Sequence, residues 1–539
     1  MTSQFCSHNY CIPHKNNNLG TDNMKNFSRY SMGLLLTLMS LSVCAQDNDI
    51  GVFKASTIAI SQSVDAFFND YLGWFAGLIF TSVPIGGAGF PLIVGWLFIA
   101  ATIFTIYFGF VQFKRSGLAL SIVSGKYSDP NAKEDGEVSH FQALTTALSG
   151  TVGLGNIAGV GVAVAIGGPG ATFWMIVCGL LGMASKFFEC TLGVKYRTVL
   201  PSGAISGGPM YYLRDAMAER GFAGLGKFLA VGFALMCILG SFGGGNMFQA
   251  NQAHAMLTYA FEVPAEYGII TGVVLAALVF SVIVGGMPSI ASVTEKVVPY
   301  MAALYVGMAL IVILVNFNQI GAALAAIFAG AFTGAGVAGG VIGALIQGLK
   351  RATFSNEAGI GSAAIAHSAV KTKEPITEGL VSTLEPFIDT VVICTMTALV
   401  ITIAGLNLAP FDGAGLTGVQ LTAASFSSSV GIFKYLLALA VIMFAFSTMI
   451  SWSYYGLKAW TYLFGEGKST EMVFKLLFCA FVIIGATIQF GAVIDFSDAA
   501  IFAMSIFNII GLYFLMPIVK DELTSFIARV KSGEIKKYK

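Results

Sequence analysis

Long stretches of apolar, uncharged residues recur along the chain from Phe90 to Val519, and they restrict the possible folds more than any other feature. Each is long enough for the roughly 20 residues of helix that cross a lipid bilayer. Only 11% of the residues are charged, whereas a soluble globular domain carries roughly 25%. The short alternating segments that are typical of a membrane β-barrel are absent. The sequence therefore predicts an all-α polytopic membrane protein.

We expect about eleven transmembrane helices, because the apolar stretches separate into that many segments of spanning length. They form a membrane domain over residues 88–520. The predicted spans are 90–111, 141–165, 171–191, 228–258, 267–285, 297–315, 339–368, 380–404, 432–463, 472–491 and 497–519.

The first residues have a different character from the rest of the chain. Lys25 and Arg29 precede an apolar run over residues 32–43, and small residues end with Ala45. This pattern is typical of a secretory signal peptide. We therefore expect a leader over residues 1–45, cleaved after Ala45, with a short uncleaved anchor or a disordered tail as the alternatives. An extracytoplasmic segment over residues 46–87 would follow it.

Basic residues predict how the chain is oriented. If the mature N-terminus lies outside and the spans alternate, most of the 29 basic residues fall in cytoplasmic loops, as the positive-inside rule requires. Lys186 is counted among these loop residues, and the tail over residues 521–539 is basic. We expect a multi-pass protein of the bacterial cytoplasmic (inner) membrane with a cytoplasmic C-terminus.

Two segments within the apolar spans are unsuited to continuous helices. The segments Ser149–Gly159 and Ser355–Ser362 combine glycines with a buried amide, and the second also contains Glu357. Glycine lowers helix propensity by about 1 kcal/mol relative to alanine. Freed backbone groups in hydrocarbon must be satisfied by protein, water or a ligand, so the sequence predicts two broken helices.

The positions of the breaks predict an architecture. After one extra leading helix, each break falls in the first helix of a group of five, and the two groups begin on opposite sides of the membrane. This is the plan of a 5+5 inverted repeat, in which discontinuous helices bind substrate near the midplane. Free N–H groups of half-helices suit a carboxylate, and unwound carbonyls suit a cation. We therefore expect recognition of a small zwitterion together with a coupling ion.

Other polar groups within the spans extend this prediction. Gln249 is a candidate for substrate contact, and the hydroxyls of Ser447 and Thr448 are suitable oxygen ligands for a hard cation. A second hypothesis is that Lys350 and Arg351 form an ion-pair network with Glu385 and Asp389, for which a structural role is favoured over a role in the outer vestibule. His254 and His367 are expected to pack or cap.

The chain has no phosphate-binding loop, because Tyr462 stands where the motif ending at Gly467-Lys468-Ser469 requires glycine. We therefore expect transport powered by an ion gradient, with no ATP-binding domain in this chain. No cysteine or histidine spacing suggests a zinc site.

At these same residues the chain resembles the alanine or glycine:cation symporter family, the sodium:alanine symporters. The likeness covers roughly residues 90–519, and it departs from the usual family signature at Ile176. The motifs that carry it are Thr151-Val152-Gly153-Leu154-Gly155-Asn156-Ile157-Ala158-Gly159-Val160, Gly167-Gly168-Pro169-Gly170-Ala171-Thr172-Phe173-Trp174-Met175, Gly207-Gly208-Pro209-Met210-Tyr211-Tyr212, Phe354-Ser355-Asn356-Glu357-Ala358-Gly359-Ile360-Gly361-Ser362-Ala363 and Trp452-Ser453-Tyr454-Tyr455-Gly456.

The resemblance implies a fold like that of the neurotransmitter:sodium symporters and cotransport of alanine or glycine with sodium. It implies a sodium site formed by Gly153, Ser447 and Thr448. The substrate residues that it implies are Gly153, Gly155, Asn156, Gln249, Asn356, Gly359, Gly361 and Trp452.

The predicted function is secondary active transport by alternating access, in which the bundle that contains both breaks rocks against a scaffold, and not enzyme catalysis. The alternatives are a proton-coupled carrier of small amino acids, with Glu357 as the titrating group, and a gated channel. The sequence leaves alanine or glycine, the D or L form, the stoichiometry and the oligomeric state open.

Overall fold

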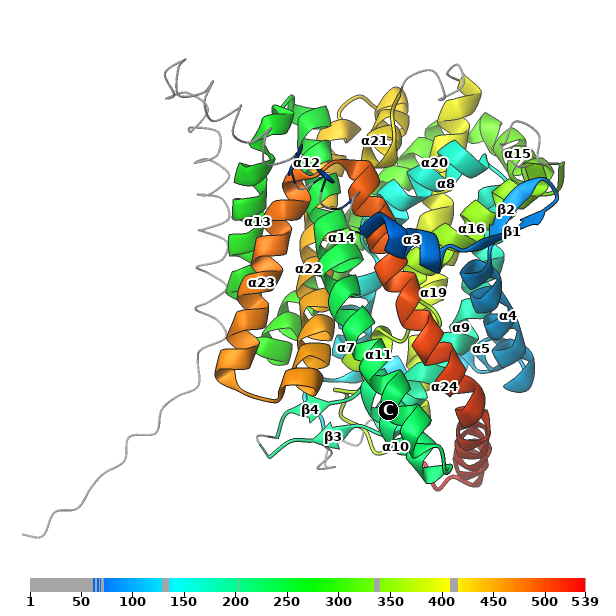
Figure 1. The fold of residues 1–539 in the computed structure, drawn as a ribbon. Coiled ribbons are helices and arrows are strands. Elements are labelled where there is room, and N and C mark those ends of the chain that lie inside the picture. Colours follow the sequence, from blue (N-terminus) through cyan, green and yellow to red (C-terminus); the bar gives the residue numbers. More distant parts are fainter. Residues whose placement is uncertain are drawn as a thin grey trace, which may run out of the picture. The chain divides into compact units, whose positions relative to one another are not determined.

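A computed structural model describes residues 62–63, 65–66, 68, 72–127, 135–201, 203–333, 340–407 and 415–538. The predicted leader and its cleavage site lie outside these residues. Of the predicted extracytoplasmic segment over residues 46–87, residues 46–61, 64, 67 and 69–71 also lie outside them. Almost all regular structure in the described residues is helical (Figure 1).

The described chain begins with a short helix and a hairpin that precede the first long helix. Strands β1 and β2 pair antiparallel, from Ser82 opposite Pro91 to Ile85 opposite Ala88. Gly86 and Gly87, both with positive φ, form the two-residue turn that glycine allows. The elements up to the first break are α3 (Gly73–Ile79), β1 (Ser82–Ile85), β2 (Ala88–Pro91), α4 (Leu92–Tyr107), α5 (Val111–Lys114), α6 (Ser116–Val123) and α7 (His140–Thr151).

The middle of the chain contains four of the long apolar helical segments. The elements, with η marking π- or 3₁₀-helical turns, are η2 (Gly155–Gly159), α8 (Val160–Gly167), α9 (Ala171–Lys195), β3 (Thr198–Val199), β4 (Ile205–Ser206), α10 (Pro209–Glu219), α11 (Ala223–Phe242), η3 (Gly243–Met247), α12 (Phe248–Phe261), η4 (Ala265–Tyr267), α13 (Gly268–Ile283), α14 (Gly286–Val315), η5 (Phe317–Gln319) and α15 (Ile320–Thr333).

The last third of the chain contains the second break and four further long segments. Its elements are α16 (Gly340–Asn356), α17 (Ala363–His367), α18 (Pro375–Ser382), α19 (Leu384–Pro386), η6 (Phe387–Cys394), α20 (Thr395–Asn407), α21 (Gly418–Ser429), α22 (Phe433–Phe464), α23 (Lys468–Thr487) and α24 (Phe490–Ser532).

Within the described residues, eight helical segments are long and apolar enough to cross a membrane, and a ninth is obtained when α7 and α8 count as one bent span. Each of the eleven predicted spans overlaps helix in the described residues. However, α4 has only 16 residues, and the two parts of the second broken helix are counted in neither total. A multi-pass helical membrane fold is therefore confirmed, while the number eleven and the inverted repeat stay predictions.

Both predicted breaks are present. In the first, α7 ends at Thr151 and the two parts of the helix are bent by 49°. In the second, α16 ends at Asn356 and α17 begins only at Ala363. Three residues in that gap have positive φ, Glu357, Gly359 and Gly361. This left-handed backbone costs glycine little but strains a side-chain residue such as Glu357.

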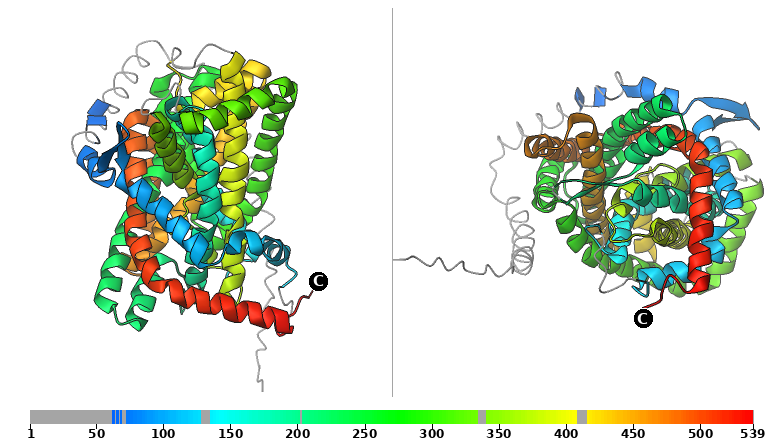
Figure 2. Two further views of the ribbon diagram at one scale, coloured as in Figure 1. Left: turned by 90° about the vertical axis from the view of Figure 1, so that its right-hand side faces the viewer. Right: turned by 90° about the horizontal axis from the view of Figure 1, so that it is seen from below.

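Helix α24 extends beyond the predicted final span. The sequence predicts a span that ends at residue 519 and a separate basic tail, but α24 continues to Ser532. Figure 2 shows the red helix bending and its last part lying across one end of the other helices. Pro517 lies inside the helix, and a proline within a helix favours a kink because it removes a backbone hydrogen bond. Arg529 in this last part pairs with Glu374 at 2.5 Å.

Candidate functional site

The first break is lined by polar atoms from three helical segments. Its own backbone begins the site, because Asn156 turns its side-chain oxygen back to accept the N–H of Gly153 at 2.9 Å. The N–H of Leu154 donates to Gln249 Oε1 at 3.1 Å. Backbone groups that the break frees are therefore satisfied by two side-chain amides, both fully or almost fully buried.

Gln249 reaches the break because the helix that carries it is itself irregular. Three consecutive glycines, Gly243 to Gly245, begin the π-helical turn η3 just before Gln249, and single π turns are frequent at functional sites. Two neighbouring amides on the same helical segment have a different role. Asn246 and Asn251 donate to backbone carbonyls of the α23 segment, so they join helices.

Helix α22 lies against the other side of the first break. Thr448 Oγ1 donates to the carbonyl of Ser149 at 3.0 Å, and Ser149 Oγ donates to the carbonyl of Ser447 at 2.6 Å. A β-carbon at Gly153 would collide with Thr448 Oγ1 and lie 3.2 Å from Gln249 Oε1. Gly153, Gln249 and Thr448 therefore meet at one point, and glycine is required there by this close approach.

The predicted sodium ligands differ in how they face this point. Thr448 Oγ1 and the Ser149 carbonyl lie at the break, and hydroxyl and carbonyl oxygens are the donors that a hard cation prefers. The Ser447 hydroxyl instead donates to Phe444 O at 3.0 Å and faces Met301 on α14. Of the two predicted hydroxyls, only that of Thr448 therefore faces the break, and Ser447 presents its main-chain carbonyl to Ser149 there.

The two breaks meet at Asp389. Gly155 of the first break lies against Ser355 of the second, where an added β-carbon would be 3.4 Å from Ser355 Cα. Asn156 Nδ2 donates to Asp389 Oδ1 at 2.6 Å, and Ser355 Oγ donates to Asp389 Oδ2 at 2.9 Å. Thr390 donates to the same oxygen. Asp389 is fully buried.

Asp389 is a site residue that the sequence interpretation misplaced. The predicted network of Lys350 and Arg351 with Glu385 and Asp389 is wrong. In the structure Lys350 and Arg351 both pair with Asp498 on α24. The signal for Asp389 was present, since an ionisable residue within a membrane span is a functional candidate by default, but its partner cannot be read from spacing along the chain.

The remaining predicted substrate residues lie around the second break. Asn356 donates to Thr390 Oγ1 at 3.0 Å and accepts the N–H of Ala358. Gly359 donates its N–H to Glu189 and accepts from Asn508. An added β-carbon at Gly361 would meet Pro209, Asn508 and Phe233. Gly359 and Gly361 are thus turned toward α9, α10 and α24, and the structure does not bring them to the first break.

Trp452 joins α22 to the second break. Its indole N–H donates to Glu357 Oε1 at 3.0 Å, and Ser362 donates to the other oxygen of this carboxylate. The indole ring fills the space at Gly245, where an added β-carbon would collide with it. Trp452 and Glu357 therefore connect the helix that carries Thr448 with the helix that carries Asn356.

Two further expectations are corrected by burial. Lys186, which was assigned to a cytoplasmic loop, lies inside α9, is fully buried and pairs with Glu385 at 3.3 Å. His367 does not simply pack or cap, because both ring nitrogens contact buried glutamates. His254 behaves as expected and bonds Thr271 and the carbonyl of Ala265.

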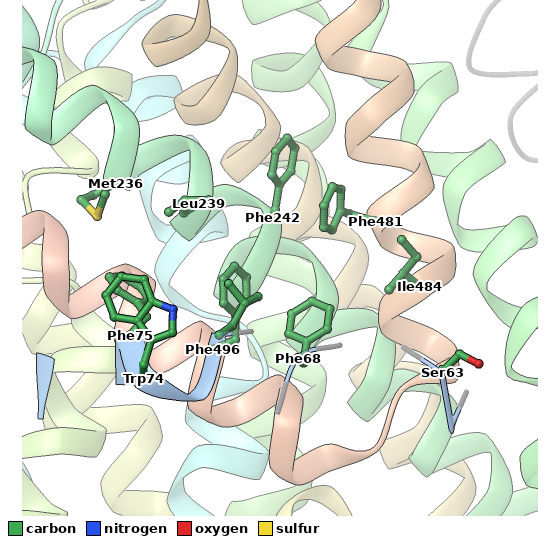
Figure 3. Close-up of a pocket in the computed structure, with 11 residues that line it drawn as sticks. Ser63, Phe68, Trp74, Phe75, Met236, Leu239, Phe242, Phe481, Ile484 and Phe496 are labelled. Atoms are coloured by element: carbon green, nitrogen blue, oxygen red, sulfur yellow. The ribbon is translucent and has the colours of Figure 1, made fainter. Parts of the chain in front are cut away.

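An apolar pocket of about 540 Å³ is lined by residues other than those of the two breaks. Figure 3 shows it surrounded by aromatic and aliphatic side chains from α3, α11, α23 and α24, with Ser63 at its edge. It contains none of the polar groups that converge at the breaks. A zwitterion or a cation would be poorly satisfied there, because charged groups lose their hydration on entering apolar surroundings.

Comparison with known proteins identifies the family. Residues 82–539 match the model of the sodium:alanine symporter family. The chain is 42% identical over 426 residues to the sodium/alanine symporter AgcS of Methanococcus maripaludis, covering 78% of this chain and 91% of that protein. It is 33% identical over 435 residues to the probable sodium/glutamine symporter GlnT of Bacillus subtilis, covering 80% of this chain and 87% of GlnT.

Among solved structures, the crystal structure of MhsT in complex with L-phenylalanine aligns with a TM-score of 0.50. The alignment covers 74% of this chain and 99% of MhsT at 15% identity, so this likeness concerns the fold alone. The named relatives are symporters, which fits the prediction of a transporter and not an enzyme. With the family model covering most of its length, the chain belongs to the sodium:alanine symporter family.

Proposed function

We propose that this protein imports a small neutral amino acid, alanine or glycine, together with sodium. The observation that carries the proposal is the convergence of Gly153, Gln249 and Thr448 at the first break, next to the contact of Gly155 with Ser355. Hydroxyl and carbonyl oxygens, which suit a cation, lie there beside backbone and amide groups, which suit a zwitterion, and this supports the proposal. Membership of the family supports sodium as the coupling ion.

The substrate is proposed from two considerations. AgcS, at 42% identity, is named a sodium/alanine symporter, whereas GlnT, at 33% identity, is named a probable sodium/glutamine symporter. The site is also closely packed, since Trp452 fills the space at Gly245, and Phe354 borders Gly155. A short side chain fits such a site better than a long one, and alanine is therefore the first substrate to test.

In the proposed mechanism, sodium binds between the first break and Thr448, with the carbonyls of Gly153 and Ser447 as further ligands. The amino acid binds between the breaks, with Asn156, Gln249 and Asn356 as the principal polar groups. Trp452 limits the space for the side chain. Sodium and substrate each raise the affinity for the other, because coupling between two sites is reciprocal.

The test is uptake of radiolabelled L-alanine into proteoliposomes under an inward sodium gradient. We expect accumulation with sodium, none when potassium replaces it, and loss in Asn156→Ala at unchanged folding. Competition by glycine, D-alanine and glutamine would then define the substrate range. Accumulation driven by a pH gradient without sodium would contradict sodium coupling and favour the proton-coupled alternative centred on Glu357. Saturation of uptake would separate a carrier from a gated channel.

A further inference from the structure

A chain of five ionisable side chains runs through one end of the helices, apart from the converging groups of the first break. His140 at the start of α7 contacts Glu378 on α18, and Glu378 contacts His367 at the end of α17 with 2.5 Å between Oε1 and Nδ1. His367 Nε2 contacts Glu385 on α19, which pairs with Lys186 on α9 at 3.3 Å. His140 is nearly buried, and the other four side chains are fully buried.

The two contacts of His367 require a proton. A carboxylate only accepts hydrogen bonds, and a neutral imidazole offers one N–H and one acceptor nitrogen. If Glu378 and Glu385 are both ionised, His367 must therefore be an imidazolium. If His367 is neutral, the carboxyl group at its acceptor nitrogen must be protonated. In either case the three groups hold one proton more than two carboxylates and a neutral imidazole.

The charge count leads to the same conclusion. With the extra proton, Glu378, His367, Glu385 and Lys186 together are neutral. Without it, they carry one uncompensated negative charge in a fully buried position, which is costly. His140 needs no charge of its own, because a neutral imidazole can donate one N–H to Glu378.

The surroundings of His367 favour a proton over a metal ion. Cys190 on α9 is a further titratable group beside it, and ligand atoms of Cys190, His367 and Glu385 lie within 4.8 Å of one another. However, both nitrogens of His367 already face carboxylate oxygens. Glu189 and Glu357 are the next acidic groups around Lys186, and ionisation of either would further favour retention of the proton.

We propose that Glu378, His367 and Glu385 form a proton-binding site, whose proton exchanges with water at the N-terminal end of α7 when α7 moves during transport. This inference rests on the proposed alternating-access function. Helix α7 is the first half of the first broken helix, and His140 follows the exposed cap residue Ser139. Moving α7 away from α18 separates His140 from Glu378 and admits water, to which His367 releases its proton. A proton that is retained holds this end closed.

The first test measures stability against pH in purified protein without substrate. Free histidine is largely neutral above its pKa of about 6.5, so at alkaline pH the folded protein holds one proton more than the unfolded chain. Its stability therefore falls as pH rises. In Glu378→Gln the proton is no longer needed, since a neutral His367 and the Lys186–Glu385 pair leave the cluster uncharged.

We expect the unfolding temperature to fall more steeply between about pH 6 and about pH 9 in wild type than in Glu378→Gln. His254→Gln is the matched control, because His254 is buried but has no carboxylate partner in the described residues, and it should follow wild type. Parallel pH profiles for wild type and Glu378→Gln would overturn the proposal. If Glu378→Gln does not fold, Glu385→Gln, which removes the other carboxylate and leaves Glu378 and Lys186 with no net charge, takes its place.

The second test sets the pH separately on the two sides of proteoliposomes during sodium-driven alanine uptake. Acidifying the side that faces the N-terminus of α7 should slow uptake by wild type and by His254→Gln, but not by Glu378→Gln. Equal slowing in all three would overturn the role in transport. Failure of all three to take up alanine at neutral pH would contradict the proposed function instead, and the unfolding profiles would still decide the proton site.

Discussion

Asn156 in the first broken helix donates its side-chain amide to Asp389 on η6, with 2.6 Å between Nδ2 and Oδ1. Ser355 in the second broken helix donates to the other oxygen of the same carboxylate. One buried side chain thus joins the two breaks, which lie about 200 residues apart along the chain. In the described part of the chain, no lysine or arginine forms an ion pair with it.

Replacing Asp389 should therefore disrupt both breaks. In Asp389→Ala the Asn156 amide and the Ser355 hydroxyl lose the carboxylate and keep only longer contacts, to the main-chain carbonyl of residue 389 for Asn156 and to Cys394 Sγ for both. A buried polar group that is left poorly satisfied costs about 1–3 kcal/mol. We expect loss of alanine uptake and a lower unfolding temperature. Asp389→Asn retains an acceptor oxygen and should keep the fold, and its sodium dependence then reports whether the charge itself matters. An alanine variant with wild-type uptake would contradict this role.

Gly153 should not tolerate any side chain. In Gly153→Ala the new β-carbon would collide with Thr448 Oγ1 and crowd Gln249, so the site must open at the point where both ligands are proposed to bind. We expect sodium-driven uptake to be abolished while the protein still folds. Gly307→Ala in α14 is the matched control, because an added β-carbon there meets nothing within 4 Å. Uptake should be unchanged in that variant.

The positions of the broken helices could be predicted from the sequence, because glycines, amides and a carboxylate within an apolar span conflict with a continuous helix. Gln249, Ser447 and Thr448 could be proposed on the same basis. The contacts between polar side chains of distant helices could not be predicted from the sequence. Lys350 and Arg351 pair with Asp498 and not with Glu385 or Asp389, since composition reveals a buried charge but not which helix faces it.

Charged side chains are also buried more deeply than the hydropathy of the sequence suggests. Lys186 lies in α9 and is neutralised by Glu385. It was predicted to lie in a loop because it stands near the end of an apolar stretch. The turn of Gly359 and Gly361 away from the first break depends on positive φ at both residues. A sequence pattern indicates that glycine permits such a backbone, but not the direction in which the chain then runs.

Thr448 should determine the apparent sodium affinity. Thr448→Val keeps the shape of the side chain but removes an oxygen next to the Ser149 carbonyl. Loss of one ligand worth about 1.4 kcal/mol raises the sodium concentration for half-maximal uptake about tenfold. Thr402→Val is the control, since Thr402 is a buried threonine that donates to Ala398 O in its own helix. Equal sodium dependence in both variants would exclude Thr448 as a ligand.

The contact of Trp452 with Glu357 should couple α22 to the second break. Trp452→Phe keeps an aromatic ring against Gly245 but removes the N–H that donates to Glu357 at 3.0 Å, and Glu357→Leu removes the acceptor of this bond. A hydrogen bond to a charged group contributes about 1.5–3 kcal/mol, so each variant should weaken alanine binding at least about tenfold. If the two side chains act through this one bond, the double variant should bind alanine hardly more weakly than either single variant. Strictly additive losses in sodium-dependent alanine binding would show that the contact does not link the two helices, and Trp452 would then act only by filling space.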